Sequence, residues 1–91
     1  MKKLKPMKLS NGQETWMRAE EFKAARLELG LTLRQWGINL GYNDTKNMRN
    51  HIQHIETGLK PVRKVHVLLI QCYLKGCRPD TYLENDGLPE D

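Results

Sequence analysis

The sequence predicts an all-α fold, a compact bundle of four to five helices, with a short N-terminal β-hairpin as an optional addition. Three observations support this prediction. Apolar residues recur at helical spacing in four segments. Helix stop and start signals separate these segments, as where Gly30 precedes Thr32 and where Gly58 follows the third segment. The 91 residues, of which 38% are hydrophobic, suffice for one small core and therefore for one main domain.

Residues 1–16 are predicted to form a basic N-terminal arm or a small hairpin. The dipeptide Asn11-Gly12 is a strong turn signal between two short extended segments. An isolated two-stranded hairpin is only marginally stable in water, so this one would have to pack on the helices, with Trp16 as its anchor.

The first helix is predicted from Ala19 to Leu29. Glu20 and Glu21 suit the positive end of the helix dipole, and Gly30 provides the stop signal. The positions expected to face the core are Phe22, Ala25 and Leu29.

The second helix is predicted to begin after Thr32. Gln35 lies three residues later, which is the spacing of a capping box. Gly37 lies where two short helices must nearly touch, and Gly41 lies where the chain must turn. The apolar stripe of this helix is Leu33, Trp36 and Leu40.

The third helix is predicted at residues 44–57, with Asn43 or Asp44 as its cap and Gly58 beyond its end. In a helical projection, one narrow arc is apolar and the opposite arc is polar. The apolar arc holds Met48, Ile52, Ile55 and then Leu59. The opposite arc, called the outer face below, holds Lys46, Asn47, Asn50, Gln53, His54 and Thr57, with Arg49 on its flank.

This outer face combines amides and cations and contains no acid. Asn and Gln side chains can pair bidentately with adenine, and Arg can pair with guanine, so the face is suited to the base edges and phosphates of DNA. A polar face that is simply solvated explains the same pattern about as well when the helix is considered alone.

The fourth helix is predicted from about Val62 to Lys75. It is apolar nearly all round, so it must be covered on two sides. One stripe is assigned to the core of the subunit and a second to the interface of a homodimer. The first holds Val65, Leu68, Leu69 and Cys72, and the second holds Val67, Ile70 and Leu74.

Charge is distributed unevenly along the chain. Its net charge is +4, but residues 46–78 carry seven Lys or Arg against one acid, whereas residues 79–91 carry five acids and no base. Such asymmetry is typical of a nucleic-acid face combined with an acidic tail, although surface charge kept for solubility explains it equally well. We therefore interpret residues 17–76 as the main domain and residues 77–91 as an acidic C-terminal tail that aids dimerisation around Tyr82 and Leu83.

The order and spacing of several short motifs resemble those of the lambda-repressor-like helix-turn-helix family, the Cro and phage-repressor type, also called XRE-like. The resemblance covers residues 19–75. Its most specific parts are Arg26, Leu29-Gly30-Leu31-Thr32, Leu40-Gly41, Ile52, Ile55-Glu56, Gly58 and Pro61. It implies a helix-turn-helix regulator, most often a repressor, that binds a palindromic site in double-stranded DNA as a homodimer. Small regulators of this type are frequent in phage and mobile elements.

The resemblance also implies roles for individual residues. Arg26 and Glu56 occupy the positions of a structural ion pair. The positions of base contacts are Arg49, Asn50, Gln53 and His54. The positions of phosphate contacts are Thr32, Arg34, Gln35, Lys60 and Arg63.

Two features depart from the family pattern. Leu33 replaces the usual Gln that grips a phosphate. About five more residues than in the usual short turn lie between Gly41 and Ile52. They form either a longer turn or an extended start of the third helix, and in the second case Lys46 and Asn47 join the base contacts.

No cofactor, no metal site and no enzyme activity are expected. The chain has no glycine-rich phosphate loop and no nucleophile elbow, and His51, His54 and the two cysteines lack zinc-finger spacing. Cys72 is interpreted as an inert core thiol and Cys77 as an exposed thiol. We expect a cytoplasmic, nucleoid-associated protein without a membrane segment. The alternative function is a protein-interaction module, an antiactivator or antitoxin-like adaptor that binds a protein partner.

Overall fold

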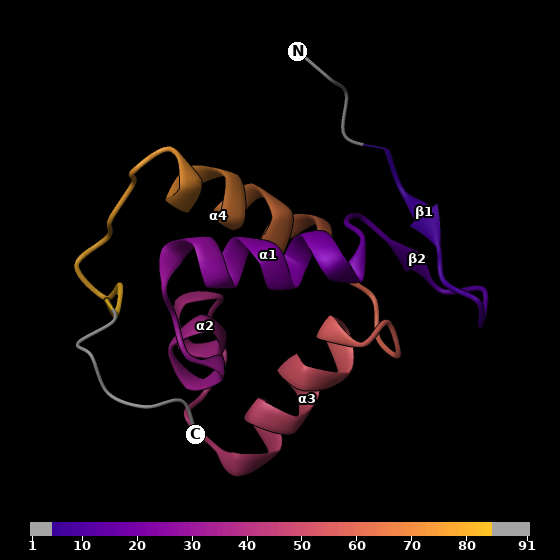
Figure 1. Cartoon of the computed structure of the whole chain (residues 1–91), viewed down its shortest axis with the longest axis horizontal. Helices are drawn as coiled ribbons and strands as arrows, with labels where there is room; N and C mark the ends of the chain where they lie inside the picture. Colours follow the sequence, from indigo (N-terminus) through magenta and orange to yellow (C-terminus); the bar gives the residue numbers. More distant parts are fainter. Residues whose placement is uncertain (1–4, 85–91) are drawn as a thin grey trace.

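Each of the four segments with helical spacing forms a helix in the computed structural model, which describes residues 5–84. Two short strands precede the helices (Figure 1). No helix in this part of the chain has both the length and the apolar character needed to cross a membrane. The elements are β1 (Met7–Lys8), β2 (Glu14–Thr15), α1 (Ala19–Leu29), α2 (Leu33–Asn39), α3 (Lys46–Glu56) and α4 (Lys64–Leu74).

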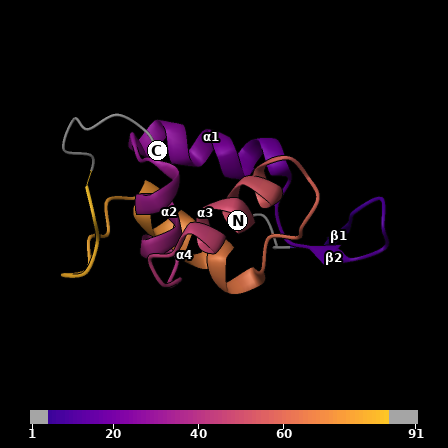
Figure 2. The ribbon, with the colours of Figure 1, turned by 90° about the horizontal axis from the view of Figure 1, so that it is seen from below.

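The predicted hairpin is present and is bonded to the helical part of the chain. β1 and β2 are antiparallel, with Met7 opposite Thr15. The Thr15 hydroxyl accepts from the Val62 amide at 2.8 Å, and the Trp16 amide donates to the Val62 carbonyl at 2.9 Å. The Lys64 ammonium lies 5.2 Å from the Trp16 ring centroid. Figures 1 and 2 both show the hairpin extending to one side of the helices, so these contacts to the α3–α4 connection anchor it.

Helices α1 and α2 begin and end where local signals predict. Gly30 adopts a left-handed conformation with φ of 73° and ends α1. Thr32 and Gln35 form both hydrogen bonds of a capping box: the Gln35 amide donates to the Thr32 hydroxyl, and the Thr32 amide donates to Gln35 Oε1. These short-range signals therefore fix the first half of the bundle.

Helix α3 begins later than predicted. Residues 40–45 form a connection, so the extra residues lengthen the turn, and Lys46 and Asn47 form the first turn of α3. The cap is Thr45, whose hydroxyl accepts from the Met48 amide at 3.0 Å. The predicted caps Asn43 and Asp44 are wrong, because each lies one or two residues before the cap position.

The closest approach between α2 and α3 occurs at Gly37. A Cβ atom at this position would overlap Met48 Sδ, so only glycine leaves room for the methionine as it lies. This explains why the contact needs a small residue. Because α3 crosses α2 here, the position of its first two turns depends on Gly37.

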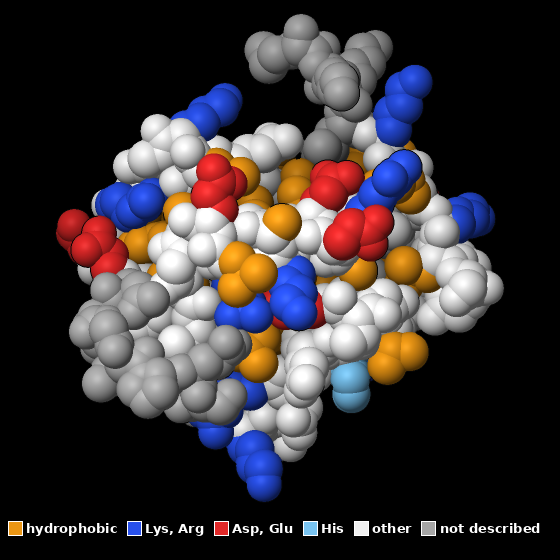
Figure 3. Space-filling view, in the orientation of Figure 1, with side chains coloured by type: hydrophobic (Ala, Val, Ile, Leu, Met, Phe, Trp, Pro, Cys, Tyr) orange, Lys and Arg blue, Asp and Glu red, His pale blue; other side chains and the backbone are white. Residues whose placement is uncertain are grey.

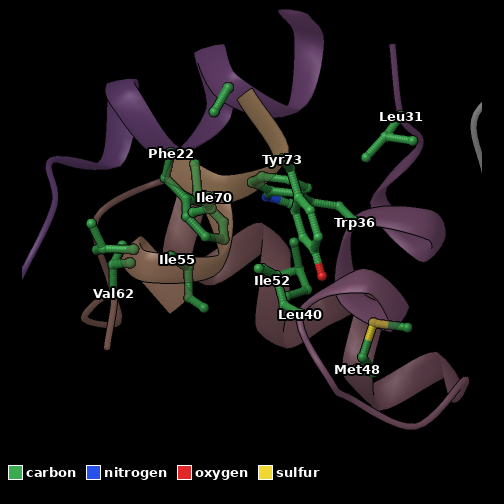
Figure 4. Packing of buried hydrophobic residues seen from close by; sticks show 12 residues of the cluster. Phe22, Leu31, Trp36, Leu40, Met48, Ile52, Ile55, Val62, Ile70 and Tyr73 are labelled. Atoms are coloured by element: carbon green, nitrogen blue, oxygen red, sulfur yellow. The ribbon is translucent and has the colours of Figure 1, made fainter. Parts of the chain in front are cut away.

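One apolar core joins all four helices. Figure 4 shows Phe22 from α1, Trp36 from α2, Ile52 from α3 and Ile70 from α4, each of which is 0% exposed. The rings of Phe22 and Trp36 pack with centroids 5.5 Å apart. Leu59 was predicted to extend the apolar arc of α3, but this is wrong: it follows the end of the helix and is 63% exposed.

Helix α4 packs on the core with the stripe that was assigned to a dimer interface. Val67 and Ile70 are buried within the subunit, at 1% and 0% exposure, so neither can contact a partner, and the prediction is wrong for both. Leu74 is 44% exposed. Val65 and Leu68, assigned to the core, are instead about half exposed. A helix that is apolar nearly all round carries no sequence signal for which stripe faces inward.

The chain after α4 folds back along α2 of the same subunit. Cys72 and Cys77 form a disulfide, so the interpretation of both residues as thiols is wrong. The Tyr82 ring packs edge-on against Tyr73, with centroids 4.9 Å apart, and the side chain of Asn39 hydrogen-bonds to the backbone of Leu83. In residues 77–84, the predicted dimer element therefore packs within its own subunit. The remainder of the predicted acidic tail, residues 85–91, lies outside the described residues.

Candidate nucleic-acid interface

The outer face of α3 is presented to solvent as the helical projection predicts. Its exposed residues are Lys46, Asn47, Asn50, Gln53 and His54, and Arg49 is partly buried at the flank. In Figure 3, the lower part of the molecule, where α3 lies in Figure 1, shows blue and white atoms, some orange atoms and one pale blue histidine. Five of the six predicted base-contact residues are thus exposed on one helix, in positions that its fixed geometry sets.

Two of the predicted contact residues converge on an acid that the sequence prediction did not assign to this site. Arg34 Nε lies 2.9 Å from Asp44 Oδ2, and Arg49 Nη1 lies 3.9 Å from Asp44 Oδ1. All three side chains are between 32% and 43% exposed. Exposed pairs of this kind contribute little to stability, so the contact between Arg34 and Asp44 can be broken at low cost. The sequence alone does not place Asp44 beside Arg34, because this contact depends on the path of the connection at residues 40–45.

The residues predicted to contact phosphates differ in exposure and in whether their polar atoms already have hydrogen-bond partners. Lys60 and Arg63 are exposed in the connection that follows α3. Gln35 is 6% exposed; its amide oxygen accepts from Thr32, and its amide nitrogen donates to the Glu84 carbonyl at 3.0 Å. The prediction for Gln35 is therefore wrong, because its polar atoms already have partners. Thr32 is partly buried, and its hydroxyl is used as the cap.

The ion pair between Arg26 and Glu56 joins α1 to the end of α3. Arg26 Nε donates to Glu56 Oε2 at 2.8 Å, and Arg26 Nη2 donates to Oε1 at 3.3 Å, so the contact is bidentate. Both side chains are only 5% exposed. Arg26 Nη1 also donates to the Leu31 carbonyl, which ties the pair to the start of α2. This acid consequently faces away from the outer face of α3 and does not repel an anion there.

A cluster of one tyrosine and two histidines, of which only His66 is fully buried, joins α3 to α4. The Tyr42 ring centroid lies 5.3 Å from that of His51 and 5.2 Å from that of His66. The Tyr42 hydroxyl and His51 Nε2 are 3.3 Å apart. Burial raises the pKa of Tyr42 and lowers the pKa of His51, where Lys60 and His54 act in the same direction. Burial, together with the charges of Arg63 and His51, lowers the pKa of His66 to about 4.

The pKa of His66 predicts a loss of stability in mild acid. Its unfolded pKa of about 6.5 lies above the folded value, so the unfolded chain binds more protons as the pH falls. The contribution of His66 is complete above pH 6.5 and is lost as the pH falls toward 4. Urea unfolding at pH 7.5, 6.5 and 5.5 should show this decline, and His66→Gln should flatten it. Equal pH dependence in both proteins would contradict the prediction.

The described residues show no cluster of metal ligands and an open hollow beside α3. Residues 5–84 contain no group of three or more His, Cys, Asp or Glu side chains placed to hold a metal. An open hollow of about 350 Å³ lies at the start of α3. It is lined by Tyr42, Asn43, Thr45, Asn47, Met48 and His51, and it continues the surface of the outer face.

Comparison with known proteins found no matching family model, no matching curated protein and no matching solved structure.

Proposed function

We propose that the chain is a sequence-specific DNA-binding regulator, most simply a repressor, in which α2 and α3 act as a helix-turn-helix. In this proposal α3 lies in the major groove, and its outer face reads base edges. The observation that carries the proposal is this exposed, acid-free face of amides and cations on a helix held rigidly from behind. The proposed family is the lambda-repressor-like one that the sequence resembles.

The dimensions and supports of α3 suit this role. Its 11 residues span about 16 Å, and the major groove, about 12 Å wide, admits an α-helix. The helix is fixed by the buried contact with Gly37, by three core residues and by the ion pair at its end. A rigid helix loses little conformational freedom on binding, which favours discrimination between base sequences.

Phosphate contacts are proposed on both sides of α3. Lys46 lies at one end, and Lys60 and Arg63 lie beyond the other. Arg34 at the start of α2 adds a third position. Together these groups would set the register of the protein on the duplex, while Asn50 and Gln53 read the bases.

A palindromic site requires a homodimer with recognition helices about 34–36 Å apart. Because Val67 and Ile70 are internal, the interface must use other apolar groups. We place it on the exposed stripe of α4 that includes Val65 and Leu68, with Leu74 beside it. This stripe does not overlap the outer face of α3.

The second candidate function is a protein-interaction module of the antiactivator or antitoxin-like kind. The observation that favours it is the exposure of large apolar side chains away from α3: Leu27 on α1 is 57% exposed, and Leu68 on α4 is 52% exposed. In this case α4 would bind a protein partner, and the outer face of α3 would be an ordinary solvated surface.

A binding titration against genomic DNA fragments at several salt concentrations tests the first function. The logarithm of affinity should fall with the logarithm of salt concentration, with a slope of about −0.9 for each phosphate neutralised. A specific site should retain binding in excess competitor DNA. Asn50→Ala should weaken binding to that site by about 1–3 kcal/mol while leaving nonspecific binding unchanged.

Two variants complete the test. Lys60→Ala should weaken binding to all sequences and reduce the salt slope by about one phosphate. Lys23→Ala, which removes an exposed lysine from α1, is the matched control and should leave affinity and slope unchanged. No DNA binding at low salt would refute the proposal and favour the protein-interaction module.

A further inference from the structure

The disulfide between Cys72 and Cys77 closes a small ring at the end of α4. Cys72 lies in the last turn of the helix and is partly buried, whereas Cys77 is exposed. Gly76, with φ of 103°, turns the chain back, and the Cys77 amide donates to the Cys72 carbonyl at 3.0 Å. The ring thus fixes the direction in which the chain leaves α4.

The residues that follow this ring, 78–84, form a segment held by specific contacts, called the docked segment below. Arg78 Nη1 donates to the Tyr73 carbonyl at 2.7 Å and to the Cys77 carbonyl at 2.8 Å. The Arg78 guanidinium carbon lies 4.6 Å from the centroid of the Tyr82 ring. Tyr82 in turn packs edge-on against Tyr73. These contacts connect the ring directly to the middle of the docked segment.

The far end of the docked segment is bonded to α2. Asn39 Nδ2 donates to the Leu83 carbonyl at 2.9 Å, and the Leu83 amide donates to Asn39 Oδ1 at 2.7 Å. Gln35 Nε2 donates to the Glu84 carbonyl at 3.0 Å. Asn39 and Gln35 are each 6% exposed, so the segment supplies partners to two buried amide side chains.

We propose that Cys72 and Cys77 are a thiol–disulfide exchange site that controls whether the docked segment is held on α2. A dithiol reductant would attack the exposed Cys77 sulfur and displace the Cys72 thiolate. The second thiol of the reductant would then release Cys77 and leave as a cyclic disulfide. The protein gains two thiols, and the reductant loses two.

Reduction opens the ring and restores rotational freedom to residues 75–77, which follow the end of α4. The docked segment is then connected to α4 by a flexible turn, and its hydrogen bonds to Asn39 and Gln35 must overcome a larger loss of chain entropy. The core contains neither cysteine, so it persists when the segment is released. The inference is independent of DNA binding.

Hydrogen exchange of the full chain, oxidised or treated with dithiothreitol, tests this proposal. The Leu83 amide reports docking because its partner is Asn39, and the amide of Ile52 reports the core. Reduction should accelerate exchange at Leu83 by roughly tenfold or more, as expected for the loss of a cross-link, and leave Ile52 unchanged. A Cys72→Ser, Cys77→Ser double variant should match the reduced protein with or without dithiothreitol.

Three outcomes would overturn the proposal. Equal exchange at Leu83 in both states would show that the disulfide does not control docking. An equal acceleration at Ile52 would show that the bond merely stabilises the whole fold. Free thiols that persist in an excess of glutathione disulfide, measured by thiol titration, would show that the pair does not exchange. In each case the test of DNA binding stands separately.

Discussion

Replacement of Glu56 by alanine is expected to lower the free energy of unfolding by about 3–5 kcal/mol, because it leaves the buried guanidinium of Arg26 without its carboxylate. Both side chains are almost fully buried, and the contact is bidentate, so water cannot replace the lost partner without opening α1 and α3. A small domain is stable by only about 5–15 kcal/mol, so the loss is a large fraction of the total. Urea unfolding followed by circular dichroism measures it.

Two control variants isolate the ion pair. Glu28→Ala removes an exposed carboxylate from α1 and should change stability by less than about 0.5 kcal/mol. The double replacement Arg26→Met with Glu56→Leu removes both charges and should recover much of the stability. If Glu56→Ala alters DNA affinity at unchanged stability, the carboxylate belongs to the binding surface, and the structural role is refuted.

Replacement of Ile70 by aspartate is expected to abolish stable folding, with a loss of about 4 kcal/mol or more, because it places an unpaired charge inside the core. The same change at Leu68, about half a turn earlier on α4, should cost less than about 1 kcal/mol, since that side chain is half exposed. Thermal unfolding of the two variants distinguishes the inner stripe from the outer one.

The same pair of variants tests the proposed dimer. Light scattering should show that Leu68→Asp is a folded monomer at concentrations where the unmodified chain is a dimer. Its affinity for a palindromic site should fall, whereas a single half-site should be bound as before. A Leu68→Asp protein that remains dimeric would place the interface elsewhere. A stable Ile70→Asp protein would contradict the burial of Ile70 in the core.

Local signals predicted the first half of the fold well. The bounds of α1 and the capping box at Thr32 follow from interactions within about four residues, and the sequence displays these directly. The outer face of α3 was predicted for the same reason, since the helical period alone separates its polar arc from its apolar arc. The Arg26–Glu56 pair came from the family resemblance, and its partners are 30 residues apart.

Most of the errors concern contacts between distant segments; the disulfide is an exception, because its two cysteines are five residues apart. Periodicity could not orient α4, because both of its stripes are apolar and only the packing against α1 selects one. Asp44 and Thr45 are adjacent possible caps, and the contact between Asp44 and Arg34 on α2 is part of what distinguishes them. The docked segment is held by Asn39 and Gln35, which lie more than 40 residues earlier in the sequence. Only the folded chain brings these residues together, so no local pattern predicts the contact. Gln35 was therefore mistaken for a surface residue.

Both ends of the described chain are bonded to its middle: Thr15 and Trp16 to Val62, and Leu83 to Asn39. The α3–α4 connection and α2 thus each form hydrogen bonds with residues far away in sequence. Such interleaving raises cooperativity, because no contiguous fragment contains a complete core with its polar groups paired. We expect the helices and the hairpin to melt in one transition with coincident far-ultraviolet and tryptophan signals, since Trp16 and Trp36 report opposite ends of this network.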